Sequence, residues 1–134
     1  VVGIRATGLQ AELAATRLAL LSADVHLDQR LAPVDLPPAI ESALAMALRE
    51  ATTNVLRHAR ANRVEVELVQ VDHELQLVIS DDGRGGDVRP GNGLAGMRER
   101  IAAVGGRLDI DSPSGGGTRL QITLPRTAIE GPAP

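Results

Sequence analysis

The sequence predicts an α+β fold, a two-layer sandwich in which helices cover one face of a single mixed β-sheet. Three observations predict it. Apolar residues recur at helical spacing in three separate stretches, and short stretches of alternating apolar and polar residues lie between and after them. The resulting order is α-β-α-β-β-α-β-β, in which strand pairs that form hairpins alternate with helices.

Two helices and one strand are predicted in the first half of the chain. Residues 4–22 form the first helix, because apolar residues recur there at roughly helical spacing, at Ile4, Leu9, Leu13, Leu18 and Leu21. Alternation over 24–28 predicts a strand. Pro37 and Pro38 open the second helix, which we expect to run to Ala59, with Asn62 as its left-handed stop. Its buried stripe consists of Ile40, Leu44, Ala47, Leu48, Ala51 and Val55.

Four strands and one helix are predicted in the second half. Alternation predicts two strands on either side of a turn at Asp72 and His73, and two more on either side of a Gly-rich turn. A loop rich in Gly and Asp lies between the two pairs, and the helix after it stops at Gly105. In chain order the predicted segments are strands at 64–68 and 75–79, a loop at 81–92, a helix at 94–104, and strands at 107–111 and 118–124.

Composition limits the chain to one domain and excludes several kinds of site. The 134 residues include no Phe, Tyr or Trp, so aliphatic side chains must form the core, and a bound planar base would lie against aliphatic side chains or His. The absence of Cys excludes disulfides, thiolate zinc sites and Cys nucleophiles. A net charge of −3 argues against a nucleic-acid surface.

No apolar run approaches the roughly 20 residues of a membrane span. The absence of Cys is compatible with a reducing cytoplasm, and we expect a cytoplasmic chain. Because it starts at Val1 rather than Met, we also expect a fragment of a longer protein, and the sequence leaves open whether that parent is anchored in a membrane.

Four polar residues share one stripe of the second predicted helix. Glu50, Asn54 and the pair Arg57 and His58 lie at positions i, i+4 and i+7 or i+8. Carboxylate and amide oxygens suit Mg²⁺ or a metal-bound water, and Arg57 could reach phosphate oxygens. The plain alternative, which residue types alone do not exclude, is an ordinary solvated helix face.

Asp81 follows directly on a predicted strand. A carboxylate at a strand end can accept a hydrogen bond from an exocyclic amine such as that of adenine, and Gly83 and Gly85 allow the backbone to approach a ligand. A simple Asp-Asp-Gly turn is the alternative.

Residues 91–96 match the pattern G-x-G-x-x-G, and Asp111 lies about 20 residues further on, as in a dinucleotide-binding fingerprint. The context is wrong, because no strand immediately precedes the glycines and repeated βαβ units are absent. What remains is a set of glycines at a helix N-terminus, where free N–H groups favour phosphate. Similarly, Gly115–Thr118 reads either as a site element or as a flexible hairpin turn.

In this order the segments resemble the motifs of the GHKL ATPase superfamily. Arg49–Ala59 is similar to the N box, and Asp81–Gly85 is similar to the first glycine box. Gly91–Arg100 resembles the lid and the second glycine box, and Gly115–Thr118 resembles the final Gly-Thr element. The residues of these motifs are most similar to those of sensor histidine kinases of the NarL/DesK type. The resemblance covers about residues 23–125. It implies the Bergerat fold.

The resemblance also implies roles for the stripe on the second helix, with ATP and Mg²⁺ as ligands. Asn54 would bind the Mg²⁺ that bridges the phosphates, and Glu50 would hold a water on that metal or act as a base. Arg57 would face the phosphates, and His58 would lie near the adenine or the ribose.

For the later motifs, the resemblance implies that Asp81 binds the adenine amino group, directly and through a water that Thr118 supports. Glycines of the two glycine boxes would let the backbone approach the nucleotide or hinge a lid over the triphosphate, at Gly83, Gly85, Gly91 and Gly93. Because there are no aromatic residues, the candidates to sandwich the base are aliphatic, namely Ile79, Leu94 and Met97.

The resemblance implies that the chain is the kinase domain of a two-component system without its phosphoacceptor His. It would transfer the γ-phosphoryl of ATP to a His on a separate dimerisation segment, and act indirectly on a response regulator. We expect residues 1–22 to be the end of a dimerisation helix, 23–125 the ATP-binding domain, 126–134 a disordered tail, and the fragment to be monomeric. An anti-sigma-factor serine kinase and an ATP-sensing module without transfer activity are the alternatives.

Overall fold

The computed structural model describes residues 8–84, 94–125 and 127–128, without the side chains of residues 58 and 59. In chain order the elements are α1 (Leu9–Ser22), β1 (His26–Leu31), α2 (Pro38–Asn54), the π-helical turn η1 (Val55–Ala59), β2 (Arg63–Val71), β3 (Glu74–Asp81), α3 (Leu94–Ala103), β4 (Arg107–Asp111) and β5 (Thr118–Pro125).

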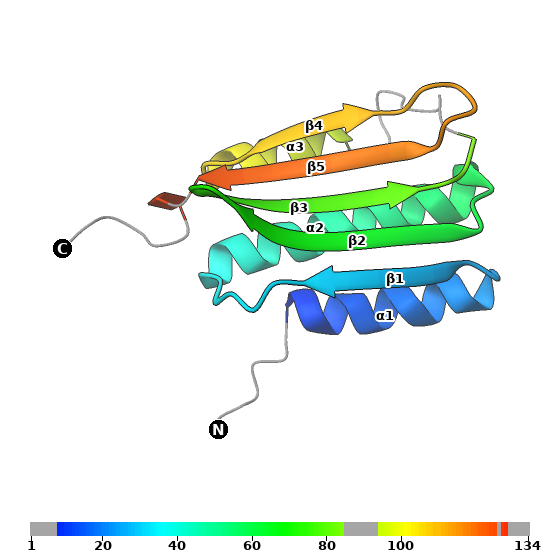
Figure 1. Ribbon diagram of the computed structural model, residues 1–134, viewed down its shortest axis with the longest axis horizontal. Coiled ribbons are helices and arrows are strands. Elements are labelled where there is room, and N and C mark those ends of the chain that lie inside the picture. The colour runs from blue at the N-terminus through cyan, green and yellow to red at the C-terminus, as the bar shows by residue number, and fades with distance from the viewer. Residues whose placement is uncertain (1–7, 85–93, 126, 129–134) are drawn as a thin grey trace.

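A single five-stranded sheet with the order β1-β2-β3-β5-β4 forms one layer. β1 runs parallel to β2, whereas the other neighbouring pairs are antiparallel. The helices α2 and α3 lie behind the sheet, and α1 lies along the β1 edge (Figure 1). The predicted two-layer α+β architecture with one mixed sheet is therefore confirmed.

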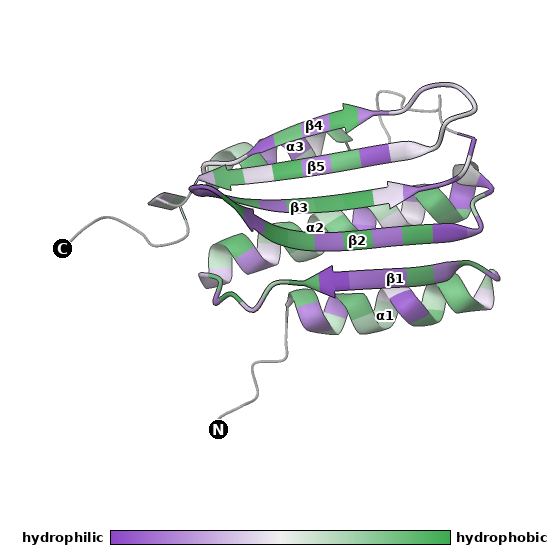
Figure 2. Cartoon of the chain, in the orientation of Figure 1, coloured by the Kyte–Doolittle hydropathy of each residue, from purple (hydrophilic) through white to green (hydrophobic). Residues whose placement is uncertain are grey.

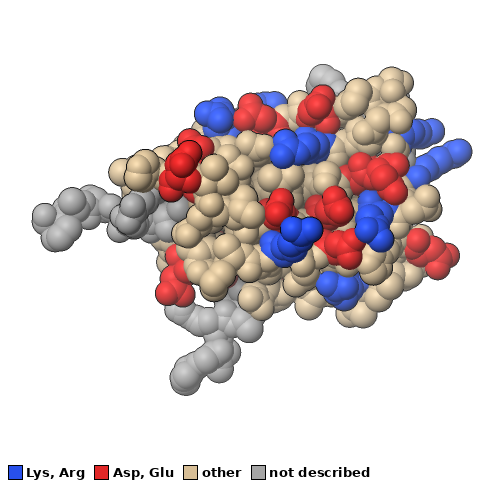
Figure 3. Space-filling model, viewed as in Figure 1, with Lys and Arg blue, Asp and Glu red and all other residues tan. Residues whose placement is uncertain are grey.

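Alternation along the strands separates a buried face from a solvent face (Figure 2). In β2, for example, Val64, Val66 and Leu68 are buried and Glu65 is exposed. Opposite charges are intermixed over the solvent face (Figure 3). The core is aliphatic, and its most deeply buried side chains are Leu20, Leu44, Leu48, Val66, Leu75, Leu77, Met97, Ile101, Leu108, Ile122 and Leu124. Every residue of the stripe predicted for the second helix is buried.

The helix α1 is part of this core. Leu9, Leu13 and Leu20 are buried in the same cluster as the leucines of α2. Leu18 and Leu21, which we placed in the apolar stripe, are instead 71% and 55% exposed. The step from Leu13 to Leu18 is five residues, too long for one helix face, and the buried stripe continues through Thr16.

Two further boundaries differ from prediction. The first strand starts at His26 rather than at residue 24, because Asp24 has a left-handed backbone, with φ of 61°, and belongs to the preceding turn. The second helix ends in a left-handed residue at Arg60, with φ of 53° and ψ of 43°, rather than at Asn62. The two-residue turn at Asp72 and His73 is confirmed by the pairing of Val71 with Glu74.

Replacing Arg60 with Gly is expected to stabilise the chain by about 0.5–1 kcal/mol. A left-handed backbone costs an L-residue roughly 1–2 kcal/mol, and the greater freedom of Gly in the unfolded chain offsets only part of that gain. Urea denaturation measures the change. The matched control is Arg107→Gly, at an exposed and extended position in β4, where the same substitution should destabilise. If both variants are destabilised alike, the left-handed conformation of Arg60 carries no strain.

None of the helices in the described ranges is long and apolar enough to cross a lipid bilayer.

Candidate functional site

Three elements that carry predicted site residues meet at one end of the molecule. The C-terminal end of α2 with η1, the end of β3 and the start of β5 lie at the right-hand side of Figure 1, and α3 packs beside α2 in the helix layer. The sheet register fixes two of them, because Asp81 pairs with Thr118 of β5 and with Val64, the second residue of β2. Asn54 and Asp81 therefore lie at the same end of the fold.

Asp81 points toward the helix layer. It shares strand parity with Leu75, Leu77 and Ile79, which are buried in the core. The N–H of Gly83 donates to Oδ1 of Asp81 at 2.9 Å, and the backbone N–H of Thr118 also donates to the carboxylate. Two backbone donors from different segments thus hold a half-buried carboxylate beneath the helices.

Partial burial raises the pKa of Asp81 above its ordinary value. Loss of hydration is the largest cause, and the nearby charge of Asp82 acts in the same direction, whereas the hydrogen bonds from Gly83 and Thr118 lower the pKa. Because burial disfavours the ionised form, Asp81 at neutral pH destabilises the ligand-free fold relative to a neutral group of the same shape.

Asp82 connects the turn after β3 to the start of β2 through hydrogen bonds. Its Oδ1 accepts hydrogen bonds from the backbone N–H groups of Asn62, at 2.8 Å, and Arg63, at 3.0 Å. The bond from Arg63 is the largest cause that lowers the pKa of Asp82. The segment that follows η1 is therefore held against the strand end that carries Asp81. Asn62 is not among the residues with positive φ.

Replacing Asp82 with Asn should destabilise the chain at neutral pH, and the difference from wild type should vanish in acid. The folded-state pKa is lowered, so the ionised carboxylate stabilises the fold above the unfolded-state pKa, and this contribution is lost as the pH falls through the folded-state pKa. Chemical denaturation across the acidic range measures it. A destabilisation that is independent of pH would show that the carboxylate charge is not responsible.

A glycine in the β4–β5 loop makes close contact with Asp81. Gly117 has φ of +77°, and a Cβ there would lie 2.1 Å from the backbone oxygen of Asp81. Next to it, Oγ of Ser112 and Oγ1 of Thr118 are 2.6 Å apart, and the N–H of Gly115 donates to the carbonyl of Arg84. The sequence did not single out Ser112, which looked like an ordinary turn residue.

The polar residues of α2 lie where the α-helix changes into the π-helical turn η1. Glu50 and Asn54 are half-buried near the end of α2, and η1 begins at the next residue. A π turn rotates less per residue than an α turn, so Arg57 lies further around the axis from Asn54 than α-helical spacing implies. Arg57 is exposed and lines a cavity together with Arg60 and Arg84.

The aliphatic candidates differ in exposure. Ile79 and Met97 are 4% and 1% exposed and belong to the core, whereas Leu94, the first residue of α3, is only partly buried. Of these three side chains, Leu94 therefore has the most surface to offer a base. The remaining predicted site residues lie outside the described part of the chain: the side chain of His58, and Gly85, Gly91 and Gly93.

The donor set on α2 fits Mg²⁺ better than it fits a fully protein-enclosed metal. Within the described residues, no group of three or more His, Cys, Asp or Glu side chains is arranged to hold a metal ion. Glu50 and Asn54 supply one carboxylate and one amide on the same helix face. Mg²⁺ typically takes one or two such protein oxygens and keeps waters and substrate phosphates as its other ligands.

Comparison with known proteins identifies similar sequences and folds. Residues 39–128 match the family described as histidine kinase-, DNA gyrase B-, and HSP90-like ATPase. The chain is 39% identical over 107 residues to the signal transduction histidine-protein kinase/phosphatase UhpB of Salmonella typhimurium, over 78% of this chain and 21% of that protein. It is 37% identical over 92 residues to the sensor histidine kinase DesK of Bacillus subtilis, over 66% of this chain and 24% of DesK.

The chain thus spans about a quarter or less of these curated relatives. Among solved structures, the histidine kinase domain of the blue-light activated kinase EL346 of Erythrobacter litoralis superposes with a TM-score of 0.74 at 21% identity, over 90% of this chain and 62% of that chain. The superposition shows that the two chains share a fold. The mycobacterial sensor histidine kinase MprB gives a TM-score of 0.67 at 25% identity, over 87% of this chain and 91% of that chain.

Proposed function

The chain belongs to the family of histidine kinase-, DNA gyrase B- and HSP90-like ATPases, and on that premise we propose that it is the ATP-binding catalytic domain of a sensor histidine kinase. It binds Mg-ATP and presents the γ-phosphoryl to a His on a separate dimerisation segment. The observation that carries the proposal is the half-buried carboxylate of Asp81, fixed by two backbone donors at the end of the fold where α2 presents Glu50 and Asn54.

Five of the described residues have a role in this proposal. Asp81 accepts a hydrogen bond from the exocyclic amine of adenine, and Leu94 covers the base. Asn54 would hold Mg²⁺ through its amide oxygen, and Glu50 would orient a water beside the metal or act as a base. Mg²⁺, when bound, would supply positive charge that neutralises the phosphates. Arg57 faces the phosphates, so the domain acts mainly by alignment and charge stabilisation.

The partners belong to the same proposal. The acceptor His lies on a dimerisation segment of the parent kinase, and a response regulator receives the phosphoryl group afterwards. The chain works on the cytoplasmic side of the cell, whether or not the parent is anchored in a membrane.

The test of transfer is to mix the chain with radiolabelled Mg-ATP and a separate dimerisation segment of its parent kinase. Label that is labile in acid and stable in base identifies phosphohistidine and supports the proposal. Acid-stable label would instead indicate a serine kinase of the anti-sigma-factor type, and nucleotide binding without any label would indicate an ATP-sensing module.

Asn54→Ala is expected to abolish detectable Mg-ATP binding, because the variant loses the amide oxygen that holds the metal. Weak binding of ATP in the absence of Mg²⁺ should stay the same as in wild type, since Asp81 is intact. Calorimetry with and without Mg²⁺ measures both. The matched control is Thr53→Ala, which removes a hydroxyl that donates to the carbonyl of Arg49 at 3.0 Å. Wild-type Mg-ATP affinity in Asn54→Ala would remove the role assigned to Asn54.

A further inference from the structure

The outermost strand β4 presents backbone groups that could extend the sheet. The strand order places β1 and β4 at the two edges. The helix α1 lies along the β1 edge, whereas α3 lies behind β4 and β5 (Figure 1). Among the described residues, no strand pairs with the outer side of β4. A strand in this position offers unpaired N–H and C=O groups to which another chain can add a strand.

The sheet register shows which backbone groups of β4 point outward. The N–H of Asp82 donates to the carbonyl of Arg63 at 3.3 Å, so the backbone groups of Asp82 face β2 and those of Asp81 face β5. In an antiparallel ladder, the N–H and C=O of one residue point to the same side, and the side alternates along the strand. The pairing of β3 with β5 and of β5 with β4 then turns the backbone groups of Leu108 and Ile110 away from β5.

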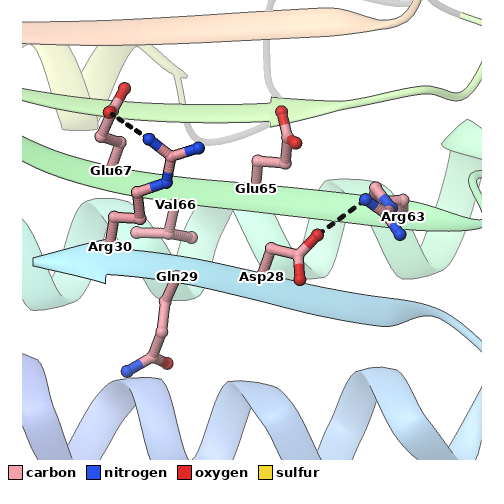
Figure 4. A pocket seen from close by; sticks show the side chains of 7 residues that line it. All are labelled: Asp28, Gln29, Arg30, Arg63, Glu65, Val66 and Glu67. Carbon is pink, nitrogen blue, oxygen red and sulfur yellow. Dashed lines mark ion pairs between the residues drawn. The ribbon is translucent and has the colours of Figure 1, made fainter.

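Arg98 of α3 binds one of these outward groups. Its guanidinium donates to the carbonyl oxygen of Leu108 at 2.6 Å. At the other edge, Arg17 of α1 donates to the carbonyl oxygen of Leu27 at 3.2 Å. Arg17 also donates at 3.1 Å to the side chain of Gln29, which points toward α1 (Figure 4). An arginine from a packed helix therefore bonds to the second residue of each edge strand.

The bond from Arg98 differs from the contacts of the arginines over the solvent face of the sheet. There, Arg63 lies 2.8 Å from Asp28, and Arg30 lies 4.0 Å from Glu67 (Figure 4). Arg98 bonds to a backbone oxygen instead, and within the described ranges it forms no ion pair with a carboxylate. Its partner is therefore the sheet edge itself.

The sequence of β4 is complementary to itself in the antiparallel orientation. If Leu108 lay opposite Ile110 of a second copy, each residue would present its outward N–H and C=O to the other, as in a hydrogen-bonded pair. Arg107 would then lie opposite Asp111 of that copy, and opposite charges at such positions stabilise a strand pair. Asp109 would face its own counterpart, which opposes pairing. The strand is therefore suited to pair with itself, apart from this one contact.

We propose that Arg98 guards the β4 edge against pairing with β4 of a second copy of the chain. The carbonyl of Leu108 is the acceptor that the N–H of Ile110 of the second copy needs, and Arg98 already occupies it. A charged side chain on an edge strand also opposes strand addition. The β1 edge has a second cover, because α1 lies along it (Figure 1). The guard does not depend on nucleotide binding, so it and the proposed function can fail separately.

The test is to replace Arg98 with Met, which keeps a long side chain and removes the donor. We expect Arg98→Met to form dimers at high protein concentration while the wild type stays monomeric, as measured by sedimentation equilibrium. In the dimer, the outward N–H of Ile110 becomes hydrogen-bonded. Its hydrogen exchange, measured by NMR, should therefore slow about tenfold as the concentration of the variant rises. In the wild type, the exchange rate of this amide should not depend on concentration.

Two control variants separate the edge from other effects. Arg17→Met also removes a bond to an edge carbonyl, but α1 still lies along that edge, so this variant should stay monomeric. Arg119→Met removes the same charge from an exposed position on β5, where Arg119 donates to the side chain of Gln121 at 2.9 Å. It should stay monomeric as well.

Four results would overturn the guard. Arg98→Met could remain monomeric at every concentration, or the wild type or a control variant could dimerise to the same extent. Dimers without slower exchange at Ile110 would show that another surface pairs. Loss of the fold in Arg98→Met, detected by circular dichroism, would show that Arg98 supports the packing of α3 on β4 rather than guarding the edge. Loss of nucleotide binding in the monomeric wild type would overturn only the proposed function.

Discussion

Replacing Asp81 with Asn is expected to abolish measurable Mg-ATP binding and to leave the ligand-free chain at least as stable as wild type. Both backbone donors, Gly83 and Thr118, already direct their N–H groups at this side chain. If the single oxygen of Asn accepts from Gly83, its NH₂ group faces the amine of the base, donor against donor. The loss of a charged hydrogen bond together with an unsatisfied donor amounts to about 3–5 kcal/mol, or more than a hundredfold in affinity.

Although Asp81→Asn weakens nucleotide binding, it should not weaken the ligand-free fold, because the folded-state pKa of Asp81 is raised. Ionised Asp81 is less favourable in the folded chain than in the unfolded chain, so the wild type carries a penalty above the folded-state pKa that Asn lacks. The stability advantage of Asp81→Asn should therefore shrink as the pH falls and disappear below the unfolded-state pKa.

Calorimetry and urea denaturation measure the two effects on the same protein. A suitable control is Asp109→Asn, an exposed carboxylate on β4 that lies 3.0 Å from Arg107. It should leave nucleotide affinity unchanged. Wild-type affinity in Asp81→Asn, or a clear loss of stability at neutral pH, would contradict the role and the environment assigned to Asp81.

Gly117→Ala is expected to cost about 3 kcal/mol of stability or more, and to weaken nucleotide binding as well. The added Cβ would lie 2.1 Å from the backbone oxygen of Asp81, so the end of β3 or the β4–β5 loop has to move. Overpacking alone costs roughly 1–3 kcal/mol, and the positive φ adds to it. Because the displaced backbone carries Asp81, the nucleotide site changes with the fold.

Gly115→Ala is the matched control for Gly117→Ala. Gly115 has nearly the same backbone, with φ of +78°, but its Cβ would meet nothing within 4 Å. This variant should pay only the left-handed cost of roughly 1–2 kcal/mol and keep its affinity for Mg-ATP. Equal losses of stability and affinity in the two variants would mean that the contact with Asp81 is unimportant.

Local patterns predicted the elements that depend on local physics. The apolar stripe of α2, the strand pairs and the hairpin at Asp72 follow from periodicity and turn chemistry, and the structure has all of them. The α1 stripe was wrong in part because Leu18 and Leu21 are apolar but lie off the buried face. On a helix, an apolar residue is buried only if its angle about the axis places it on the packed face.

Features that depend on contacts between distant parts of the chain could not be predicted from the sequence. Asn62 is a common left-handed residue, yet its N–H is held by Asp82, twenty positions away, and the left-handed stop falls on Arg60 instead. Likewise, an acid at the end of a strand could be predicted at Asp81. Its orientation toward the helices and its pairing with Thr118 follow only from the arrangement of β3 and β5. The π turn at η1 left no recognisable signal.

If Asn54 and Asp81 hold opposite ends of one nucleotide, a single ligand must perturb both ends of the site at once. We test this by titrating the ¹⁵N-labelled chain with a non-hydrolysable ATP analogue and Mg²⁺. We expect the amides around Asn54 and around Gly83 and Thr118 to shift together along one saturation curve, and Mn²⁺ in place of Mg²⁺ to broaden the signals near Asn54 most strongly. Shifts confined to one of the two groups, or two independent saturation curves, would contradict a single site that spans both residues.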